Sequence, residues 1–254
     1  MKILTININS IRARIESFMR ILESGVYDVV CVQELKVPDA DFPHSLFEFS
    51  GYNIKVFGQK SYNGVAIFSK LSIEDVVRGM PNYPDANARF IECVIDGRFR
   101  LINVYMPNGE HVDSAKFPYK IEWMTKFSEY IYKYEKSPEP VIICGDFNVA
   151  IEDRDVYSPK DYEGSSISAP AARKIMNEWL ARGWTDQWRR LNGDNVGYTW
   201  FGYRPGSLEK NKGLRLDYFL TNEFAGQSVK NCRVDMTPRL EERPTDHAGL
   251  VLEI

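Results

Sequence analysis

Polar side chains follow several apolar stretches of this sequence, and VIICGDFN at residues 141–148 shows the pattern most directly. In an extended chain alternate side chains share a face, so Asp146 and Asn148 point one way and Phe147 points the other. One interpretation is a turn after a strand, where Asp and Asn bond to their own backbone. The other is a functional pair that brings a carboxylate and an amide to one site.

Other predicted strand ends carry the same kind of residue. Asn7 and Glu34 follow the first two apolar runs, Tyr105 ends a later one, and Asp246 with His247 directly precedes the last. Each has a structural explanation when taken alone, because strand ends are often polar and a single histidine is more often structural than catalytic. Their shared placement is the stronger observation, since open α/β sheets gather ligand sites outside strand ends.

Asp217 lies inside the apolar segment LRLDYFL, where an unpaired carboxylate is costly. Pairing with nearby Arg215 is one explanation. The other is that it belongs to a set rich in hard oxygen donors, namely Asn7, Glu34, Asp146, Asn148, Asp217 and Asp246. Such donors suit Mg²⁺ or Mn²⁺ better than zinc, and a cation would relieve the repulsion among the carboxylates.

Alternating elements would position these residues. We expect strands at 2–8, 27–34, 52–58, 64–70 and 140–146, a hairpin over 89–105 that turns at Asp96-Gly97, and helices at 13–24, 117–136 and 169–183. The last third is strand-rich, in GYTWFGYR, LRLDYFLTN, SVKNCRVD and AGLVLEI. This pattern indicates an α/β protein with mixed sheets, and the missing G-x-G-x-x-G after the first strand disfavours a Rossmann fold.

Composition describes an ordinary globular chain of 254 residues with 44% hydrophobic and 26% charged side chains. No linker or repeat divides it, so we expect one domain over residues 1–254. The N-terminus lacks a signal-peptide pattern and no apolar run reaches the roughly 20 residues that span a bilayer, so we expect a cytoplasmic protein. Four isolated cysteines are expected to be buried free thiols. The net charge of −3 argues only weakly against a nucleic-acid partner, because basic patches coexist with acidic clusters.

At these residues the sequence resembles the exonuclease III and apurinic/apyrimidinic (AP) endonuclease branch of the endonuclease/exonuclease/phosphatase superfamily. The resemblance runs through NINSIRAR (7–14), VQELK (32–36), YNGVAIFSK (62–70), YMPNG (105–109), GDFN (145–148), YTWFGYR (198–204), NKGLRLDYFL (211–220) and TDHAGL (245–250). It implies a four-layer α/β sandwich, in which two mixed β-sheets pack face to face with helices on the outside. Ser10, Gly202 and the segment TDHAG (245–249), which stands for the more usual Ser-Asp-His-x-Pro, depart from the family pattern. These departures bear on loop shape and substrate preference rather than on the chemistry.

The resemblance also implies roles for the site residues. Glu34 would be the principal Mg²⁺ ligand, Asp146 would orient and deprotonate the attacking water, and Asp217 would orient His247 toward the phosphate. Asn148 and Tyr105 would hold the scissile phosphate. The metal set implied for Mg²⁺, with Mn²⁺ as a substitute, is Asn7, Glu34, Asp146, Asn148, Asp246 and His247. The number of ions is left open.

DNA contacts are expected from basic, amide and aromatic groups near this edge, which the resemblance places at Arg12, Lys36, Arg89, Lys116, Lys120, Trp200, Asn211 and Arg215. Trp200, Phe201 and Tyr203 are candidates for the wall of a pocket that holds a flipped sugar or a frayed 3′ end, with Trp200 preferred. The loop at 163–170 is expected to border that pocket.

The function that follows is a Mg²⁺-dependent DNA-repair phosphodiesterase of bacterial or archaeal type, acting as a monomer on duplex DNA with abasic sites, nicks or 3′ ends. It would cleave 5′ to AP sites, remove 3′-blocking groups, or degrade 3′ ends. One alternative is a 3′-end enzyme with little internal AP-site incision. Others are a diesterase or phosphatase of lipid headgroups, and a nucleic-acid-binding relative without activity. The sequence shows no membrane-binding segment, which argues against the lipid enzyme.

Overall fold

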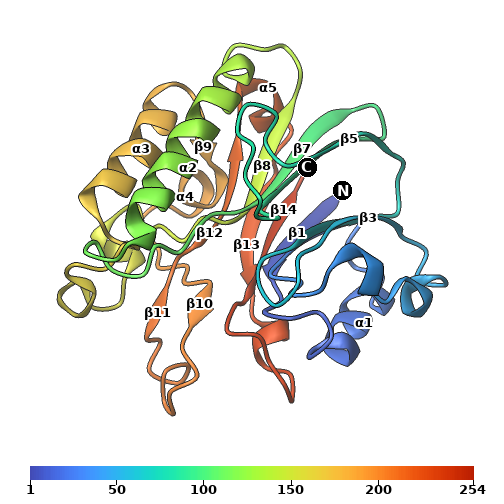
Figure 1. Ribbon diagram of the computed structural model, residues 1–254, viewed down its shortest axis with the longest axis horizontal. Helices are drawn as coiled ribbons and strands as arrows, with labels where there is room; N and C mark the ends of the chain where they lie inside the picture. The colour runs from blue at the N-terminus through green and yellow to red at the C-terminus, as the bar shows by residue number, and fades with distance from the viewer.

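The computed structural model describes residues 1–254, in which two six-stranded sheets form the centre (Figure 1). The first sheet has the order β13-β14-β1-β2-β4-β3 and the second β5-β6-β7-β8-β12-β9. The strands of the first are β1 (Lys2–Asn7), β2 (Val29–Gln33), β3 (Asn53–Phe57), β4 (Val65–Ser69), β13 (Asn231–Asp235) and β14 (Gly249–Glu253). Those of the second are β5 (Ile73–Arg78), β6 (Phe90–Ile95), β7 (Phe99–Tyr105), β8 (Val141–Asp146), β9 (Thr185–Asp186) and β12 (Asp217–Thr221). A separate ribbon pairs β10 (Trp200–Phe201) with β11 (Gly213–Leu214).

Helices cover the two outer faces. The α-helices are α1 (Ile15–Glu23), α2 (Lys116–Ile131), α3 (Pro170–Ala181), α4 (Gln187–Asn192) and α5 (Glu223–Gly226), and short 3₁₀ turns include η4 (Asp153–Asp155) and η6 (Thr237–Arg239). Figure 1 shows α2 and α3 side by side over the second sheet and α1 on the opposite side, over the first. The predicted four-layer sandwich is confirmed.

The helix α2 shows why these layers adhere. Trp123, Phe127 and Ile131 recur every four residues, are buried, and therefore form one apolar stripe. Trp123 stacks on Phe127 with ring centroids 5.4 Å apart, and Phe127 meets Trp179 of α3 edge to face at 5.5 Å. The same cluster contains side chains of the second sheet, so one core joins the two helices to that sheet.

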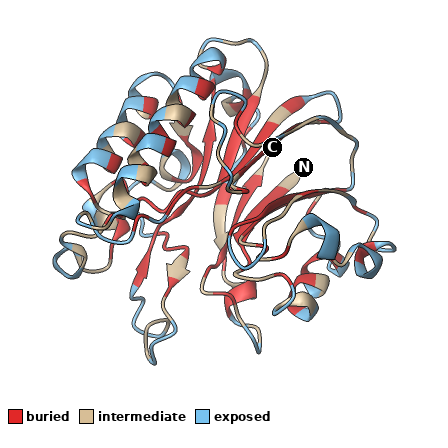
Figure 2. Ribbon diagram, viewed as in Figure 1, coloured by how far each residue is buried: buried red, intermediate tan, exposed pale blue.

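Side chains of the inner strands alternate between two cores. Cys31 of β2 lies in the core between the sheets, whereas its neighbours Val30 and Val32 lie in the core under α1. Because both faces of such strands are buried, as the red strands of Figure 2 show, the sequence reads as a continuous apolar run. All four cysteines are buried and free, as expected.

Most predicted elements are confirmed, including the hairpin of β6 and β7. The sequence reading missed β5, whose side chains are only partly buried, and the short helices α4 and α5. It also overestimated GYTWFGYR, where only Trp200–Phe201 is a strand. None of the helices combines the length and the apolar character that crossing a membrane requires.

Strand directions bring the polar ends together. β1 runs parallel to β2, and β7 runs parallel to β8, so Asn7 pairs with Gln33 and Tyr105 with Asp146 at the carboxyl ends of these strands. β12 and β14 run antiparallel to their neighbours β8 and β1, so their beginnings lie at the same edge. Asp217 therefore pairs directly with Asp146.

Candidate active site

Asn7 joins the two sheets at this edge. Its Nδ2 donates to Glu34 Oε1 at 2.8 Å and to Asp146 Oδ2 at 2.9 Å. Asn7 and Asp146 are buried, while Glu34 is partly exposed. Residues 7, 34 and 146 lie far apart in the sequence, yet a single amide holds both carboxylates.

The segment that follows β8 satisfies both interpretations of VIICGDFN. Asn148 N donates to Asp146 Oδ1 at 2.9 Å, which is the local bond of a turn. Asn148 Nδ2 also donates to Asp146 Oδ2 at 3.3 Å, so the two side chains do lie together. Phe147 points away into the core that contains Trp179 and Tyr218. The turn therefore builds the functional pair.

His247 forms a second part of the site. Its Nδ1 lies 2.8 Å from Asp217 Oδ2, and its Nε2 lies 3.7 Å from Asp146 Oδ2. Burial by itself lowers the pKa of His247, but the Asp217 and Asp146 carboxylates outweigh burial and raise it to about 10. The ring is therefore an imidazolium at neutral pH, with Nδ1–H donated to Asp217.

The carboxylates of the site are crowded. Burial raises the pKa of Asp146 to about 7, His247 and Asn7 oppose this rise, and Asp217 and Glu34 add to it. Burial, followed by the charges of Glu34 and Asp146, also raises the pKa of Tyr105 well above its ordinary value. Asp217 Oδ1 is buried without a hydrogen-bond partner. The chain thus gathers more negative charge than its own groups neutralise.

Asp246 is stabilised differently from Asp146. Its Oδ1 accepts from Asn9 Nδ2 and its Oδ2 from Trp200 Nε1, both at 3.0 Å. Burial raises the pKa of Asp246, but His247, Trp200 and Asn9 together lower it below its usual range. Asp246 is therefore an anion whose two oxygens are already partnered within the chain.

The carboxylate and amide oxygens of the site are the kind of ligands that a hard divalent cation prefers. No group of three or more His, Cys, Asp or Glu side chains is arranged so that it could hold a metal ion by itself. Glu34 and Asp146 nevertheless share the Asn7 amide, and the raised pKa of Asp146 records an electrostatic cost that a cation would remove. Carboxylate and amide oxygens, with water completing the shell, are what Mg²⁺ and Mn²⁺ prefer.

Two site residues were not selected from the sequence. Asn9 accepts from Lys36 Nζ at 2.6 Å and donates to Asp246, and Asn108 Nδ2 donates to Asn148 Oδ1 at 2.9 Å. Both lie in motifs that carried the resemblance, NINS and YMPNG. Their position in those motifs was the available signal, but their partners are set only by folding.

The structure separates the predicted DNA contacts into groups. Arg89 and Lys116 line a cleft of about 580 Å³ that also contains Tyr105 and Asn108, beside the site. The Arg89 guanidinium lies over the Tyr105 ring at 4.9 Å. Arg12 is exposed and lines a different pocket, together with Arg14, Arg20 and Arg243. Lys36 lies within the site, with Nζ 2.8 Å from Glu34 Oε2.

Two of these predictions are wrong. Lys120 is fully buried, and its Nζ donates to three backbone carbonyl oxygens rather than facing solvent. Arg215 is also buried, where it pairs with Asp155 at 2.8 Å and Asp186 at 2.6 Å. Neither side chain is placed to contact DNA, and Arg215 is not the partner of Asp217.

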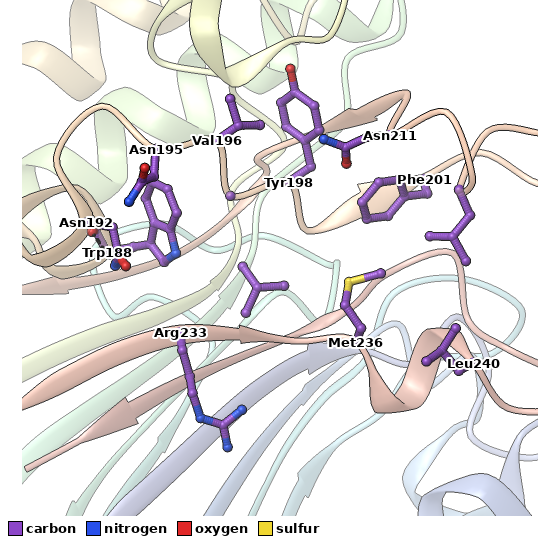
Figure 3. A pocket seen from close by; sticks show the side chains of 13 residues that line it. Trp188, Asn192, Asn195, Val196, Tyr198, Phe201, Asn211, Arg233, Met236 and Leu240 are labelled. Atoms are coloured by element: carbon purple, nitrogen blue, oxygen red, sulfur yellow. Dashed lines mark hydrogen bonds between the residues drawn. The ribbon is translucent and has the colours of Figure 1, made fainter.

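The aromatic residues of the β10–β11 ribbon do not share one pocket. Trp200 faces Asp246 and packs with Val156, Leu214 and Leu216, whereas Phe201 lines a cavity of about 710 Å³. Figure 3 shows that cavity, with Trp188, Tyr198 and Asn211 also on its wall. Tyr203 is exposed, and its hydroxyl accepts from Arg14 Nη2 at 2.9 Å. Trp200 borders the carboxylate site through Asp246, and the Tyr203 hydroxyl accepts from Asn9 Nδ2 at 3.4 Å. The loop at 163–170 reaches the site through Ser166, whose hydroxyl donates to Asn108 O.

The fold and the site together define a class. A two-sheet sandwich with carboxylates, amides and an Asp-paired imidazolium at one edge has the groups needed to hydrolyse a phosphate ester: hard-ion ligands, a proton acceptor and cationic hydrogen-bond donors. The comparisons agree. Residues 4–247 match the Endonuclease/Exonuclease/phosphatase family, and the chain belongs to that family.

Relatives narrow the class further. The chain is 31% identical to exodeoxyribonuclease III of Haemophilus influenzae, with 100% of this chain and 99% of that protein covered. Among solved structures, a DNA-hairpin-bound variant of the 3′ phosphatase NExo from Neisseria aligns with a TM-score of 0.95 at 34% identity, over 100% of this chain and 99% of that one. An AP endonuclease from Archaeoglobus fulgidus gives 0.95 at 35% identity with the same coverage. The chain is a hydrolytic nuclease of the exodeoxyribonuclease III and AP endonuclease type.

Proposed function

We propose that this chain is a Mg²⁺-dependent DNA-repair phosphodiesterase that acts as a monomer on abasic sites and on blocked 3′ ends of duplex DNA. The observation that carries the proposal is the Asn7 amide, which holds Glu34 and Asp146 at 2.8 and 2.9 Å where the two sheets meet. Nucleases of this family depend on metal ions, and Mg²⁺ is the ion that this oxygen-rich set suits best. Glu34 would be its main ligand, with Asn7, Asp146, Asn148, Asp246 and His247 around it.

The bound cation would neutralise charge on the phosphate. The protein groups would do the rest. Asp146 would accept the proton of the attacking water, because the Asn7 amide holds its carboxylate at the site and no guanidinium or ammonium group is paired with it. Tyr105 would donate to a phosphate oxygen, and Asn148 would do the same by exchanging its 3.3 Å bond to Asp146 Oδ2 for one to the phosphate. Both would stabilise the charge that develops there.

His247 would act as a cationic donor rather than as a base. Asp217 fixes Nδ1, and Nε2 lies 3.7 Å from Asp146, beyond hydrogen-bond distance. Nε2–H is therefore free to bond a phosphate oxygen. Arg89 and Lys116, on the cleft beside Tyr105, would hold the DNA backbone, and Trp200 would border the flipped sugar or the 3′ end.

The balance between internal and terminal cleavage is a separate question. The 3′ phosphatase and the AP endonuclease match with the same TM-score of 0.95 and nearly the same identity, so similarity favours neither activity. A 3′-end enzyme with little AP-site incision is therefore the second candidate. The two differ in whether a sugar inside a continuous strand reaches the site.

One assay tests both. Cleavage of an internal AP-site duplex is compared with release of phosphate from a nicked duplex that bears a 3′-phosphate, in Mg²⁺, in Mn²⁺ and in excess chelator. The proposal predicts metal-dependent activity on at least one substrate, and the ratio of rates decides between the candidates. Undiminished hydrolysis in chelator would refute it, and gel filtration during the same preparation tests the monomer.

A further inference from the structure

Lys120 is a fully buried lysine on α2, which is rare because an ammonium loses its hydration there. Its Nζ donates to the backbone carbonyl oxygens of Asn148 at 2.6 Å, Asn108 at 3.1 Å and Ser166 at 3.1 Å. An ammonium has three donor hydrogens and no acceptor, so this geometry uses all of them. Lys120 is therefore completely engaged inside the protein.

The three carbonyl oxygens come from three different loops. Asn108 follows β7, Asn148 follows β8, and Ser166 lies in the segment that precedes α3. The lysine stem is packed closely as well: a Cβ on Gly109 would lie 2.8 Å from Lys120 Cδ. One side chain thus holds three loops that are separate in the sequence.

Two of these loops carry amides of the site. Asn108 Nδ2 donates to Asn148 Oδ1 at 2.9 Å, which leaves Asn148 Nδ2 to donate to Met106 O at 3.0 Å and Asp146 Oδ2 at 3.3 Å. Asn148 has a positive φ of 51°, a conformation that turns its peptide away from the course of β8. The bond from Lys120 to the Asn148 carbonyl stabilises that turn.

We propose that Lys120 is a positioning residue that sets the orientation of the Asn108–Asn148 amide pair in the active site. The inference rests on the nuclease function proposed above. It replaces a role in binding the DNA backbone, for which the side chain is not accessible. A lysine that merely filled space would not need three carbonyl acceptors from three loops.

The test compares two substitutions with a control on the same helix. Lys120→Met retains the length and removes the donors. Lys120→Arg retains the charge, but its planar fork does not direct three hydrogens at three converging oxygens. Lys126→Met is the control, because Lys126 is on the surface of α2 and pairs only with Glu129, at 3.0 Å. For each variant, kcat and KM are measured on the 3′-phosphate duplex, and the side-chain amide signals of Asn108 and Asn148 are followed by ¹H–¹⁵N NMR without DNA.

A misplaced group costs about 100-fold in rate, so Lys120→Met is expected to lower kcat by about that factor with KM within about threefold. Relative to the wild type, the Asn108 and Asn148 amide signals are expected to shift in both Lys120 variants and to stay in place in Lys126→Met. Wild-type kcat in a folded Lys120 variant overturns the proposal, and so does a loss expressed only in KM, or amide signals that stay in place. If Lys120→Met does not fold, Lys120→Arg decides by the same criteria. An inactive wild-type enzyme would contradict the nuclease proposal, while the amide signals would still test the positioning.

Discussion

Two buried groups of carboxylates lie in this molecule, and they are neutralised in opposite ways. Arg215 forms ion pairs with Asp155 at 2.8 Å and with Asp186 at 2.6 Å, and Arg189 forms a second one with Asp155 at 2.6 Å. Asp146 receives amide and backbone hydrogens, but the nearest cation is the His247 ring at 3.7 Å. Both groups border β12 in the same sheet, so the difference comes from the residues and not from the layer.

The comparison separates structural charge from functional charge. Asp155 joins η4 to the start of β12, and Asp186 accepts from Arg189 N as the N-cap of α4, so these carboxylates hold elements in place. Asp146 has no such partner, and burial and neighbouring carboxylates raise its pKa, as is common at catalytic sites. Permanent guanidinium partners would abolish that property.

The largest effect is expected from a substitution among the carboxylates of the candidate active site. Asp146→Asn is expected to lower kcat by about 10³- to 10⁴-fold, because it removes the proposed proton acceptor. Its free energy of unfolding should not fall, since one crowded charge disappears. The measurements are initial rates on the 3′-phosphate duplex and urea denaturation. Asp155→Asn is the matched control, with the opposite result: loss of stability, because two arginines lose a partner. Near-wild-type turnover in Asp146→Asn would contradict the assignment of the base.

The next largest effect is expected from a substitution in the buried ion-pair network of Asp155, Asp186 and Arg215. Arg215→Met should cost about 3–5 kcal/mol in the free energy of unfolding, because Asp155 and Asp186 lose the cation that they share. Urea denaturation followed by tryptophan fluorescence measures this. Lys174→Met is the control, because Lys174 and its partner Glu178 are 78% and 49% exposed, and such surface pairs contribute at most about 1 kcal/mol. Equal losses in the two variants would show that the buried network is not special.

Sequence and resemblance together predicted the carboxylates of the candidate active site better than the buried ion-pair network around Arg215. Alternation along an extended strand predicted that Asp146 and Asn148 lie together, and they do, although β8 ends at Asp146 and a turn with a positive φ of 51° at Asn148 brings them together. The motif order supplied Asp217 and His247. Arg215 was misplaced because its partners lie 60 and 29 residues away, so its surroundings depend on packing that no local pattern records. Lys120 failed for the same reason, since backbone carbonyl oxygens exist at every position and only the fold selects three of them.

A third prediction sharpens the contrast through the cation. Mg²⁺ at about 100 times its Kd should stabilise the wild type by about 2.7 kcal/mol and raise Tm by roughly 5–10 °C. Glu34→Gln should lose most of that gain, because Glu34 is the proposed main ligand, whereas Arg215→Met should retain it. Differential scanning calorimetry at matched ionic strength separates specific binding from screening. An equal Mg²⁺ shift in the wild type and in Glu34→Gln would exclude Glu34 as the main ligand.

The smallest effect concerns Asp246, which belongs to the functional edge but is partnered by the chain. Trp200→Phe removes the Nε1–H that Asp246 Oδ2 accepts at 3.0 Å, and a hydrogen bond to a carboxylate contributes about 1.5–3 kcal/mol. Trp184→Phe is the control, because Trp184 is buried and its Nε1 has no partner, whereas Trp200 is partly exposed and its Nε1 is bonded. Both variants lose the same ring atoms, so the difference between their unfolding free energies isolates the hydrogen bond. We expect Trp200→Phe to be the less stable by about 1.5 kcal/mol. Equal stabilities would mean that Asp246, like Asp146, depends on a cation from outside the chain.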